Sequence, residues 1–330
     1  MRRRWLGFNL GARNSSDCMR SRTHLSNQRR SDGLTGASAT ASRGAFQGRS
    51  LPARSPAAAA SPHRRLGRIA ALVFALVAAG CASPRGQVTP ATFRVISYNI
   101  HHGEGADSRI DLERIAAVIT QAQADIVGLQ EVDKGVRRTQ RRDSPAELAA
   151  LTGLTCVFSN NFHFQGGEYG NAVLTRFPIV KWTNTHLEML RTNEQRGVMQ
   201  VLLNVGDREL LFMTTHIDYR RDDAERLHNV AEFKQLIGKY GRLPIVFCGD
   251  FNDQPDSRTC RAMREQFDDA WAEVGKGDGF TITSERPSKR IDYIWILRGS
   301  PLTPLKAWVP SSYASDHLPV VAELRWEPSR

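Results

Sequence analysis

The sequence predicts an α/β (α+β) fold for residues 92–326, in the form of a four-layer α/β/β/α sandwich with two mixed β-sheets packed face to face beneath outer helices. Two observations predict this class. Short runs rich in β-branched and aromatic residues alternate with amphipathic helical segments from Phe93 onward. Some consecutive runs are joined by a tight turn, as antiparallel strands are, whereas others are separated by a helix, as parallel strands are. A span of about 235 residues with both patterns is typical of one layered domain.

The first half of this domain begins with a strand expected at residues 92–99. Asp111 can then cap a helix. Apolar side chains follow it at helical spacing, at Leu112, Ile115, Ala116, Ile119 and Ala122. The next strand is expected at residues 125–131. Residues 144–147 (Ser-Pro-Ala-Glu) have capping-box spacing with proline at the first helical position, so a second helix is expected through Leu151.

The second half is expected to begin with strands at residues 171–176, 197–205 and 209–216, of which the last two are joined by a turn and look antiparallel. A longer helix is expected from about Asp222 until Gly241 and Pro244 stop it. Its apolar face is predicted to consist of Leu227, Val230, Ala231, Phe233, Leu236 and Ile237.

Three further strands complete the expected domain. They lie at residues 245–249, 291–297 and 319–324, and the last is predicted to be an edge strand. Residues 161–170, which include two consecutive glycines, are expected to form a rim loop where the substrate is selected.

The N-terminal quarter of the chain predicts export. Residues 1–62 show no helical or strand period and are interpreted as disordered or as the product of a start codon placed too early. Residues 63–81 combine a basic stub, an apolar run and small residues, which is typical of a signal peptide; residues 82–91 are a linker. The end of the signal resembles a bacterial lipobox, with Cys81 as the lipidated residue and Ala78 where leucine is commoner. We expect an exported protein, either a membrane-anchored lipoprotein or a periplasmic protein.

Charge excludes a general nucleic-acid footprint on the domain. The chain carries a net charge of +11, but residues 1–80 hold 14 of its 45 basic residues and only two of its 34 acidic ones. The remaining 250 residues are therefore close to neutral, with 31 basic and 32 acidic residues. The dense cluster Arg137-Arg138 with Arg141-Arg142 is interpreted as a solvated face. Bulk attraction to duplex phosphates is not expected.

The cysteines give no disulfide framework. Cys156, Cys248 and Cys260 are the only thiols after Cys81, and none has zinc-ligand spacing to another. Cys248 lies within an apolar strand-like run, so we expect it to be a buried core residue.

Polar residues recur at the ends of the predicted strands, which indicates one shared site. A carboxylate at a buried strand end is costly unless it is paired or binds a metal. A single such residue is most often a turn residue, so the joint pattern carries the argument. The residues concerned are Asn99, His101, Glu131, His216, Asp218, Asp250, Asn252, Asp292, Asp316 and His317.

Seven ordered motifs then resemble those of the endonuclease/exonuclease/phosphatase superfamily, also called DNase I-like. They span nearly all of residues 93–325 and occur at residues 97–100 (SYNI), 129–131 (LQE), 170–176 (GNAVLTR), 215–218 (THID), 249–252 (GDFN), 290–294 (RIDYI) and 315–319 (SDHLP). The resemblance implies a metal-dependent hydrolase acting on phosphoric esters.

The resemblance also implies roles for the metal ligands. Glu131 would bind Mg²⁺ or Mn²⁺, with Asn99 beside it and Asp316 offering a carboxylate to the same cluster. A hard cation with oxygen ligands can polarise a phosphoryl oxygen while keeping positions open for water and substrate.

The catalytic roles implied by the resemblance fall on five residues. His317 would be a general base or an electrostatic partner of the attacking water, and Asp292 would hold its ring. Asp250 would orient or deprotonate that water, Asn252 would hydrogen-bond a phosphate oxygen, and His216 would donate to the phosphate in the transition state.

Three residues are candidates for binding substrate phosphate, each with an alternative. His101 stands where the nuclease branch often has an acid, so it could contact metal or phosphate. Asn171 could instead satisfy turn backbone. Arg226 could reach a phosphate, although a solvated helix-face arginine is the favoured interpretation. Asp218 and Arg290 also remain open between structural and functional roles.

The motifs leave the substrate open. A phosphodiesterase or phosphomonoesterase acting on a lipid or small molecule fits the export signal, and an exported endonuclease or exonuclease acting on DNA or RNA is the alternative. A non-catalytic binding protein on the same scaffold is the competing class, disfavoured because the metal and base positions carry competent residues. We expect a monomer tethered to the membrane by its lipid.

Overall fold

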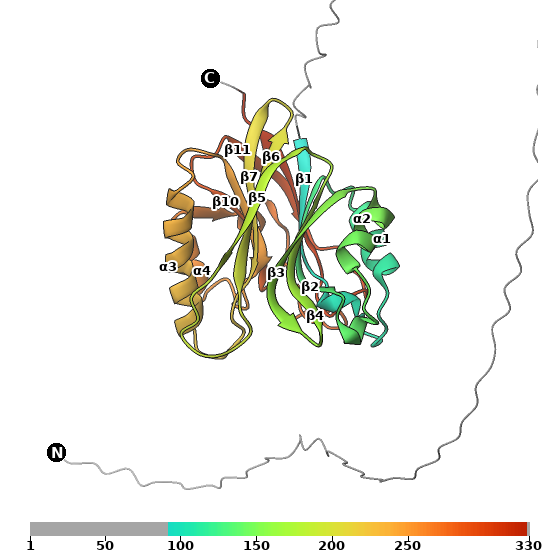
Figure 1. The fold of residues 1–330 in the computed structure, drawn as a ribbon. Helices are drawn as coiled ribbons and strands as arrows, with labels where there is room; N and C mark the ends of the chain where they lie inside the picture. The colour runs from blue at the N-terminus through green and yellow to red at the C-terminus, as the bar shows by residue number, and fades with distance from the viewer. Residues whose placement is uncertain (1–91, 329–330) are drawn as a thin grey trace, which may run out of the picture. The chain divides into compact units, whose positions relative to one another are not determined.

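The computed structural model describes residues 92–328, so the expectations for residues 1–91, including lipidation of Cys81, lie outside the described residues. The described part forms two six-stranded sheets that face each other, with helices on the outer side of each (Figure 1). This is the predicted four-layer sandwich, which is confirmed. Among residues 92–328, no helix is both long and apolar enough to cross a membrane.

The first sheet carries the N- and C-terminal strands at its centre. In spatial order it consists of β11 (Leu302–Trp308), β12 (Val320–Trp326), β1 (Thr92–Asn99), β2 (Ile126–Lys134), β4 (Gly167–Thr175) and β3 (Thr155–Phe164). β1 and β2 run parallel, and the other neighbours are antiparallel. The two chain ends of the domain therefore meet side by side in one sheet.

In the second sheet, several strands that are adjacent in space also follow one another in the sequence. In spatial order it consists of β5 (Ile179–His186), β6 (Gly197–Val205), β7 (Arg208–His216), β8 (Ile245–Asp250), β10 (Asp292–Leu297) and β9 (Phe267–Asp269). β7 and β8 are the parallel pair, separated in the chain by a helix. β6 and β7 are antiparallel, as the turn between them predicts.

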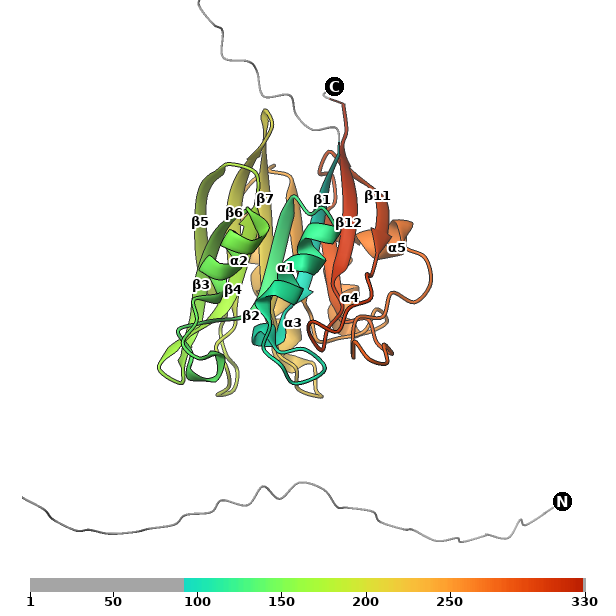
Figure 2. The same cartoon turned by 90° about the vertical axis from the view of Figure 1, so that its right-hand side faces the viewer.

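The helices cover the outer faces of the sheets. Figure 2 shows α1 (Leu112–Gln121) and α2 (Ser144–Thr152) on the face of the first sheet, while α3 (Ala224–Gly238) and α4 (Arg258–Met263) lie on the second sheet in Figure 1. The remaining helical segments are α5 (Ala270–Val274) and two 3₁₀ turns, η1 (His101–Gly103) and η2 (Arg137–Thr139).

Capping explains where the first two helices begin. Asp111 accepts a hydrogen bond from the Arg114 amide and caps α1, as predicted. The cap of α2 lies one residue earlier than expected, because Asp143 accepts from the Ala146 amide and Ser144 is the first helical residue. The capping box predicted at Ser144 is therefore wrong in register.

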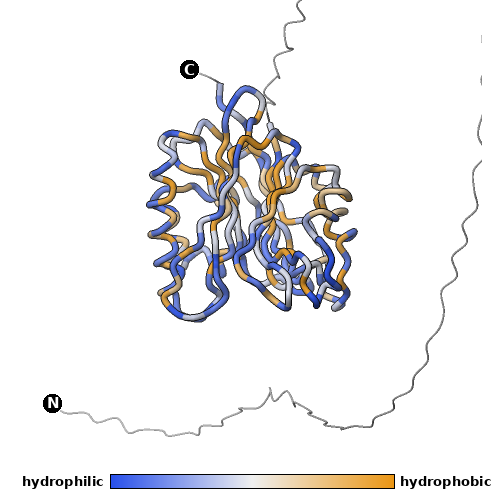
Figure 3. The backbone as a smooth tube through the Cα atoms, in the orientation of Figure 1, coloured by the Kyte–Doolittle hydropathy of each residue, from blue (hydrophilic) through white to orange (hydrophobic). Residues whose placement is uncertain are grey.

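The core lies in three layers, one between the sheets and one beneath each pair of helices, and the apolar segments cluster there in Figure 3. Cys248 is buried between the sheets, as predicted, and the three cysteines of the described part are free. Gly128 lets the sheets approach, since a Cβ there would lie 2.3 Å from the Cys248 Sγ. A larger residue at this point would push the two sheets apart.

Four expectations about local structure are wrong. Residues 319–324 do not form an edge strand, because β11 covers β12 on its outer side. Residues 161–170 are not a loop but belong to the β3–β4 hairpin. On α3, Ala231 is exposed and Leu227 is only partly buried, although the other four predicted inward residues are buried.

Candidate active site

The strand registers bring three predicted catalytic residues to one edge of the second sheet. His216 ends β7 and Asp250 ends β8, and the two are direct neighbours in the parallel ladder. Asp292 begins β10 and pairs with Asp250 in the antiparallel ladder. All three side chains are buried. Polar groups spread over 76 residues of the sequence therefore lie on three neighbouring strands, with Asp250 between the other two.

His317 completes this group from the loop that precedes β12. Its Nδ1 lies 2.9 Å from the Asp292 Oδ2, and its Nε2 lies 3.7 Å from the Asp250 Oδ2. The carboxylate of Asp292 thus fixes the ring orientation. Burial lowers the pKa of His317, but Asp292, Asp250 and Asp316 outweigh it and raise the pKa to about 10. The imidazole–carboxylate pair predicted from the motifs is present.

Asp250 lies at the centre of the polar cluster. Its Oδ1 accepts from the Asn252 amide at 2.9 Å, and its Oδ2 accepts from the Asn99 Nδ2 at 3.1 Å. Burial and the nearby Asp292 raise the pKa of Asp250 to about 7, despite the opposing effect of His317. The protonated and ionised forms of this carboxyl are thus both accessible near neutral pH.

Glu131 projects from a β-bulge. Gln130 and Glu131 together oppose a single residue of β4, and Glu131 adopts a φ of 59°, which is uncommon for a residue other than glycine. The bulge turns the carboxylate out of the regular pleat, and Glu131 lines the pocket described below. Such strain persists only where the surrounding structure enforces it, and it is frequent at functional sites.

Asn99 links the two carboxylates. Its Nδ2 donates to the Glu131 Oε1 at 3.0 Å as well as to Asp250, and its Oδ1 accepts from the His101 amide at 3.0 Å. Asp316 does not line the pocket described below, and its Oδ1 is 3.8 Å from the His101 Nδ1. Of the three predicted metal ligands, Asn99 therefore contacts Glu131, whereas Asp316 neighbours His101.

His216 has a defined proton arrangement. Burial, Arg196 and His317 hold its pKa well below the usual range, so the ring is neutral. The Arg196 Nη1 lies 3.3 Å from the His216 Nδ1. Because an arginine can only donate, Nδ1 must accept and Nε2 must carry the hydrogen. The Nε2, which lies 3.5 Å from the Asp250 Oδ2, therefore carries the hydrogen on the side of this carboxylate.

These residues open into a pocket of about 250 Å³ whose outer wall is aromatic and cationic. Phe162, Phe164 and Tyr169 come from the β3–β4 hairpin. The Arg138 guanidinium lies over Phe164 and Tyr169, 4.9 and 5.4 Å from the ring centroids. The expected rim at residues 161–170 is thus present as a hairpin instead of a loop.

The sequence analysis did not single out several of the residues that line this pocket. They are Glu194, Arg196 and Tyr219, whereas Phe162, Phe164 and Tyr169 lie in the expected rim and Arg138 belongs to the arginine cluster. The interpretation of the arginine cluster as a solvated face is wrong for Arg138, whose Nε and Nη2 donate to the fully buried carboxylate of Asp133 at 2.8 and 2.9 Å. Arg196 could have been recognised as a candidate site residue, because it lies directly before the strand predicted at residues 197–205.

Two of the three expected phosphate-binding residues do not line the pocket. Asn171 is buried in β4 and donates to the Gly197 carbonyl of β6. Arg226 is also buried, so its interpretation as a solvated helix-face residue is wrong. Its Nε donates to Asp253, and its Nη1 donates to the carbonyls of Asp218 and Arg220, which braces the loop after β7. His101 does line the pocket.

The two residues left open have structural contacts. Asp218 is buried, and its carboxylate accepts from Asn193 at 3.2 Å and from the Arg220 amide at 3.1 Å. Arg290 is buried in an ion pair with Asp269 at 2.8 Å. Neither residue lines the pocket.

The fold and this site define a class, the DNase I-like α/β sandwich with a histidine–carboxylate centre at one sheet edge. The chain belongs to the endonuclease/exonuclease/phosphatase family, whose model matches residues 96–317. Members of this family are hydrolases that act on phosphoester bonds.

Individual relatives share this architecture at low identity. The chain is similar to the uncharacterized protein YbhP of Escherichia coli K12, with 25% identity over 72% of this chain and 98% of YbhP. It is also similar to bovine tyrosyl-DNA phosphodiesterase 2, with 24% identity over 56% of this chain and 49% of that protein. The structure of a mannosyl-6-phosphatase from Bacteroides thetaiotaomicron superposes with a TM-score of 0.61 at 20% identity, covering 71% of this chain and all of the other.

Proposed function

We propose that the protein is a divalent-metal-dependent phosphoesterase that uses water as the nucleophile. The observation that supports this most strongly is the convergence of His317, Asp292 and Asp250 at one sheet edge beside Glu131. In this constellation an imidazole oriented by Asp292 and the Asp250 carboxylate line a pocket together with the partly buried Glu131 carboxylate.

The residues fit a hard divalent cation. The Glu131 carboxylate lines the pocket, Asn99 fixes its orientation, and Asp316 lies 3.8 Å from His101 of the pocket lining. These residues would hold Mg²⁺ or Mn²⁺, which would neutralise charge on a phosphoryl oxygen.

The remaining steps follow from the contacts of the protein side chains. A water held between the Asp250 carboxylate and the His317 Nε2 would attack phosphorus and leave its proton on this pair. Asp292 would keep the His317 ring in place. The His216 Nε2–H and Asn252 would donate to phosphate oxygens as charge develops. The leaving oxygen would depart on the opposite side of phosphorus.

A small substrate fits the pocket better than a duplex does. Its volume of about 250 Å³ is below the range of drug-sized sites, and Phe162, Phe164 and Tyr169 close one side. The domain is also close to neutral overall. We therefore propose a phosphomonoester or phosphodiester of a small molecule or lipid headgroup as the substrate. Sugar phosphatase and nucleic-acid phosphodiesterase activities are attributed to relatives, and both belong in the test.

The test is a hydrolysis panel with the full protein after removal of metals by EDTA. Mg²⁺ or Mn²⁺ is added back with p-nitrophenyl phosphate, bis(p-nitrophenyl) phosphate, sugar phosphates, phosphatidylinositol lipids, sphingomyelin, RNA and plasmid DNA. We expect turnover of a small ester only with metal, and loss of it in Glu131→Gln. Glu168→Gln, at an acid outside the pocket lining, serves as the control. Metal-independent hydrolysis, or full activity of Glu131→Gln, would contradict the proposal.

A further inference from the structure

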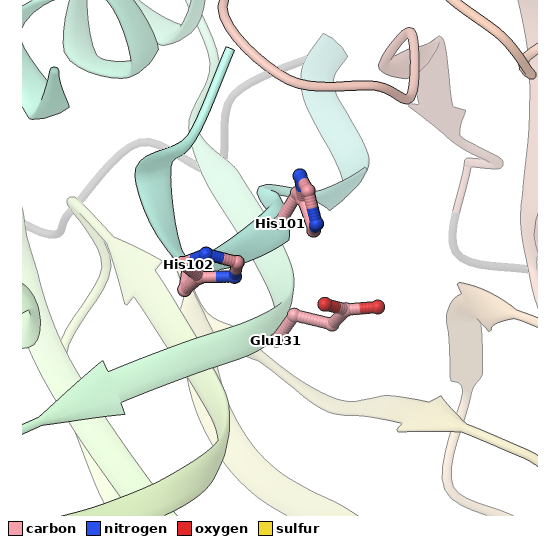
Figure 4. A group of neighbouring side chains, drawn as sticks. All are labelled: His101, His102 and Glu131. Atoms are coloured by element: carbon pink, nitrogen blue, oxygen red, sulfur yellow. The ribbon is translucent and has the colours of Figure 1, made fainter. Parts of the chain in front are cut away.

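A second group of metal-ligating atoms lies beside the catalytic cluster. His101, His102 and Glu131 each offer one ligand atom, and these atoms lie within 4.8 Å of one another. Figure 4 shows the two imidazole rings and the carboxylate gathered on one side of β2. The two histidines come from η1, directly after β1, and the carboxylate comes from the bulge of β2.

His102 has the arrangement of a metal ligand held by an outer carboxylate. The side chain is buried, with an exposed fraction of 5%, and its Nε2 lies 3.3 Å from the Glu104 Oε2. Its Nδ1 is buried and has no hydrogen-bond partner among residues 92–328. If Nε2 donates its hydrogen to Glu104, Nδ1 presents a lone pair with nothing to accept from. Ligating histidines characteristically place their second nitrogen on a carboxylate in this way.

His101 adds a second such nitrogen. Its Nδ1 is also buried without a hydrogen-bond partner, and the nearest acidic oxygen, on Asp316, is 3.8 Å away. Buried polar nitrogens without partners are rare in folded proteins, and two neighbouring ones beside a carboxylate are consistent with an ion as the missing partner.

The backbone around the two histidines adopts an unfavourable conformation that brings their rings together. His101, His102 and Gly103 have φ values of 44°, 47° and 88°, three successive residues in the left-handed region. The Gly103 amide donates to the Ile100 carbonyl at 2.7 Å, and the Glu104 amide donates to the His101 carbonyl at 2.8 Å. This turn places two adjacent histidines on the same carboxylate, which an extended strand would direct to opposite faces.

From these contacts we propose that His101, His102 and Glu131 form a binding site for a divalent transition ion such as Zn²⁺ or Co²⁺, with Glu104 as its supporting carboxylate. Two imidazoles and one carboxylate suit such ions, whereas Mg²⁺ prefers oxygen ligands. Ligand atoms around one ion at about 2.1 Å are separated by about 3–4 Å. A closure of about one ångström would therefore complete the site.

The test measures binding, so it does not depend on the proposed hydrolysis. The full protein is stripped with EDTA and titrated with Co²⁺, which is followed by its visible absorption, and with Zn²⁺ and Mg²⁺ by calorimetry. We expect Co²⁺ and Zn²⁺ to bind more tightly than Mg²⁺. We expect Glu104→Gln to weaken Co²⁺ binding by about 10- to 100-fold, and His102→Gln to weaken it more.

Two controls make the result specific. His163→Gln, at an exposed histidine of β3, should leave Co²⁺ binding unchanged. His317→Gln tests the other possible cluster, Asp250, Asp292 and His317. A Co²⁺ signal that follows His317 and ignores His102 and Glu104 would overturn the proposal, as would equal affinities for Co²⁺ and Mg²⁺. Intact Co²⁺ binding without any phosphoesterase activity would instead refute the proposed function and leave this site in place.

Discussion

Arg196 determines which nitrogen of His216 carries the proton. The guanidinium donates to Nδ1, so Nε2 carries the hydrogen that we propose is donated to the phosphate. A neutral histidine without that donor could adopt the other tautomer and present a lone pair to the phosphate.

We therefore predict that Arg196→Gln lowers kcat on the order of 10-fold, because a phosphate donor is lost in part of the molecules. The ¹⁵N shifts of the His216 ring should show a shift from the Nε2–H tautomer to a mixture. The exposed Arg242→Gln is the matched control. An unchanged tautomer with reduced kcat would show that Arg196 acts in another way.

His317 makes the stability of the metal-free protein depend on pH. Its folded-state pKa of about 10 lies above the unfolded value of 6.5. The stabilisation is therefore fully present below pH 6.5 and is lost as the pH rises toward 10.

For His317→Gln we predict a lower free energy of unfolding at pH 6.5, and a difference from wild type that shrinks by on the order of 2 kcal/mol by pH 10. Urea unfolding in EDTA at both pH values measures it. His228→Gln, at a partly exposed histidine of α3, is the matched control for the loss of a histidine. A difference in the free energy of unfolding between wild type and His317→Gln that increases with pH would contradict this prediction.

At the scale of elements, the sequence predicted all eight inner strands and none of the four edge strands. The missed strands β3, β5, β9 and β11 are the outer members of the two sheets. An inner strand is buried on both faces and appears as an apolar run, as β8 does, whereas β5 is largely exposed. β11 contains Pro304 at a register shift, which an edge tolerates but which obscures a strand pattern.

The same difference between inner and edge strands decides which residues of the candidate site could be predicted from the sequence. Residues at the ends of inner strands, such as Asp250 at the end of β8 and Asp292 at the start of β10, were recognisable because a carboxylate next to an apolar run is unusual. Residues 161–170 were expected to form a rim, but not as an aromatic hairpin, because β3 is an edge strand that is only partly buried. Glu104 belongs to no strand end and gave no signal in the sequence.

Inter-sheet packing gives a prediction at this scale. Gly128→Ala should lower the free energy of unfolding by about 1–3 kcal/mol, since the new methyl group would meet the Cys248 Sγ and the Thr214 side chain. Urea denaturation measures the change. Gly238→Ala at the exposed end of α3, where a Cβ would have open space, is the control and should have little effect or stabilise slightly. Equal changes in the free energy of unfolding for Gly128→Ala and Gly238→Ala would show that the sheets tolerate a wider spacing.

At the scale of the whole molecule, the export signal predicted at residues 63–81 carries a prediction about where the protein lies in the cell. We propose that Cys81 carries a lipid that tethers the enzyme to a membrane. Cys81→Ser should move the protein from the membrane fraction to the soluble fraction of its host, whereas Cys156→Ser should not. Unchanged partitioning of Cys81→Ser would refute the lipid anchor and leave the phosphoesterase proposal untouched.

The central claim is that the His317 centre performs metal-assisted hydrolysis of a phosphoester. It is tested most directly by the kcat of the full protein on the best small ester of the panel, with saturating Mg²⁺ or Mn²⁺. His317→Ala should reduce kcat by about 10²- to 10⁴-fold, while His228→Ala retains it, with both variants folded by circular dichroism. Wild-type turnover in His317→Ala would contradict the account.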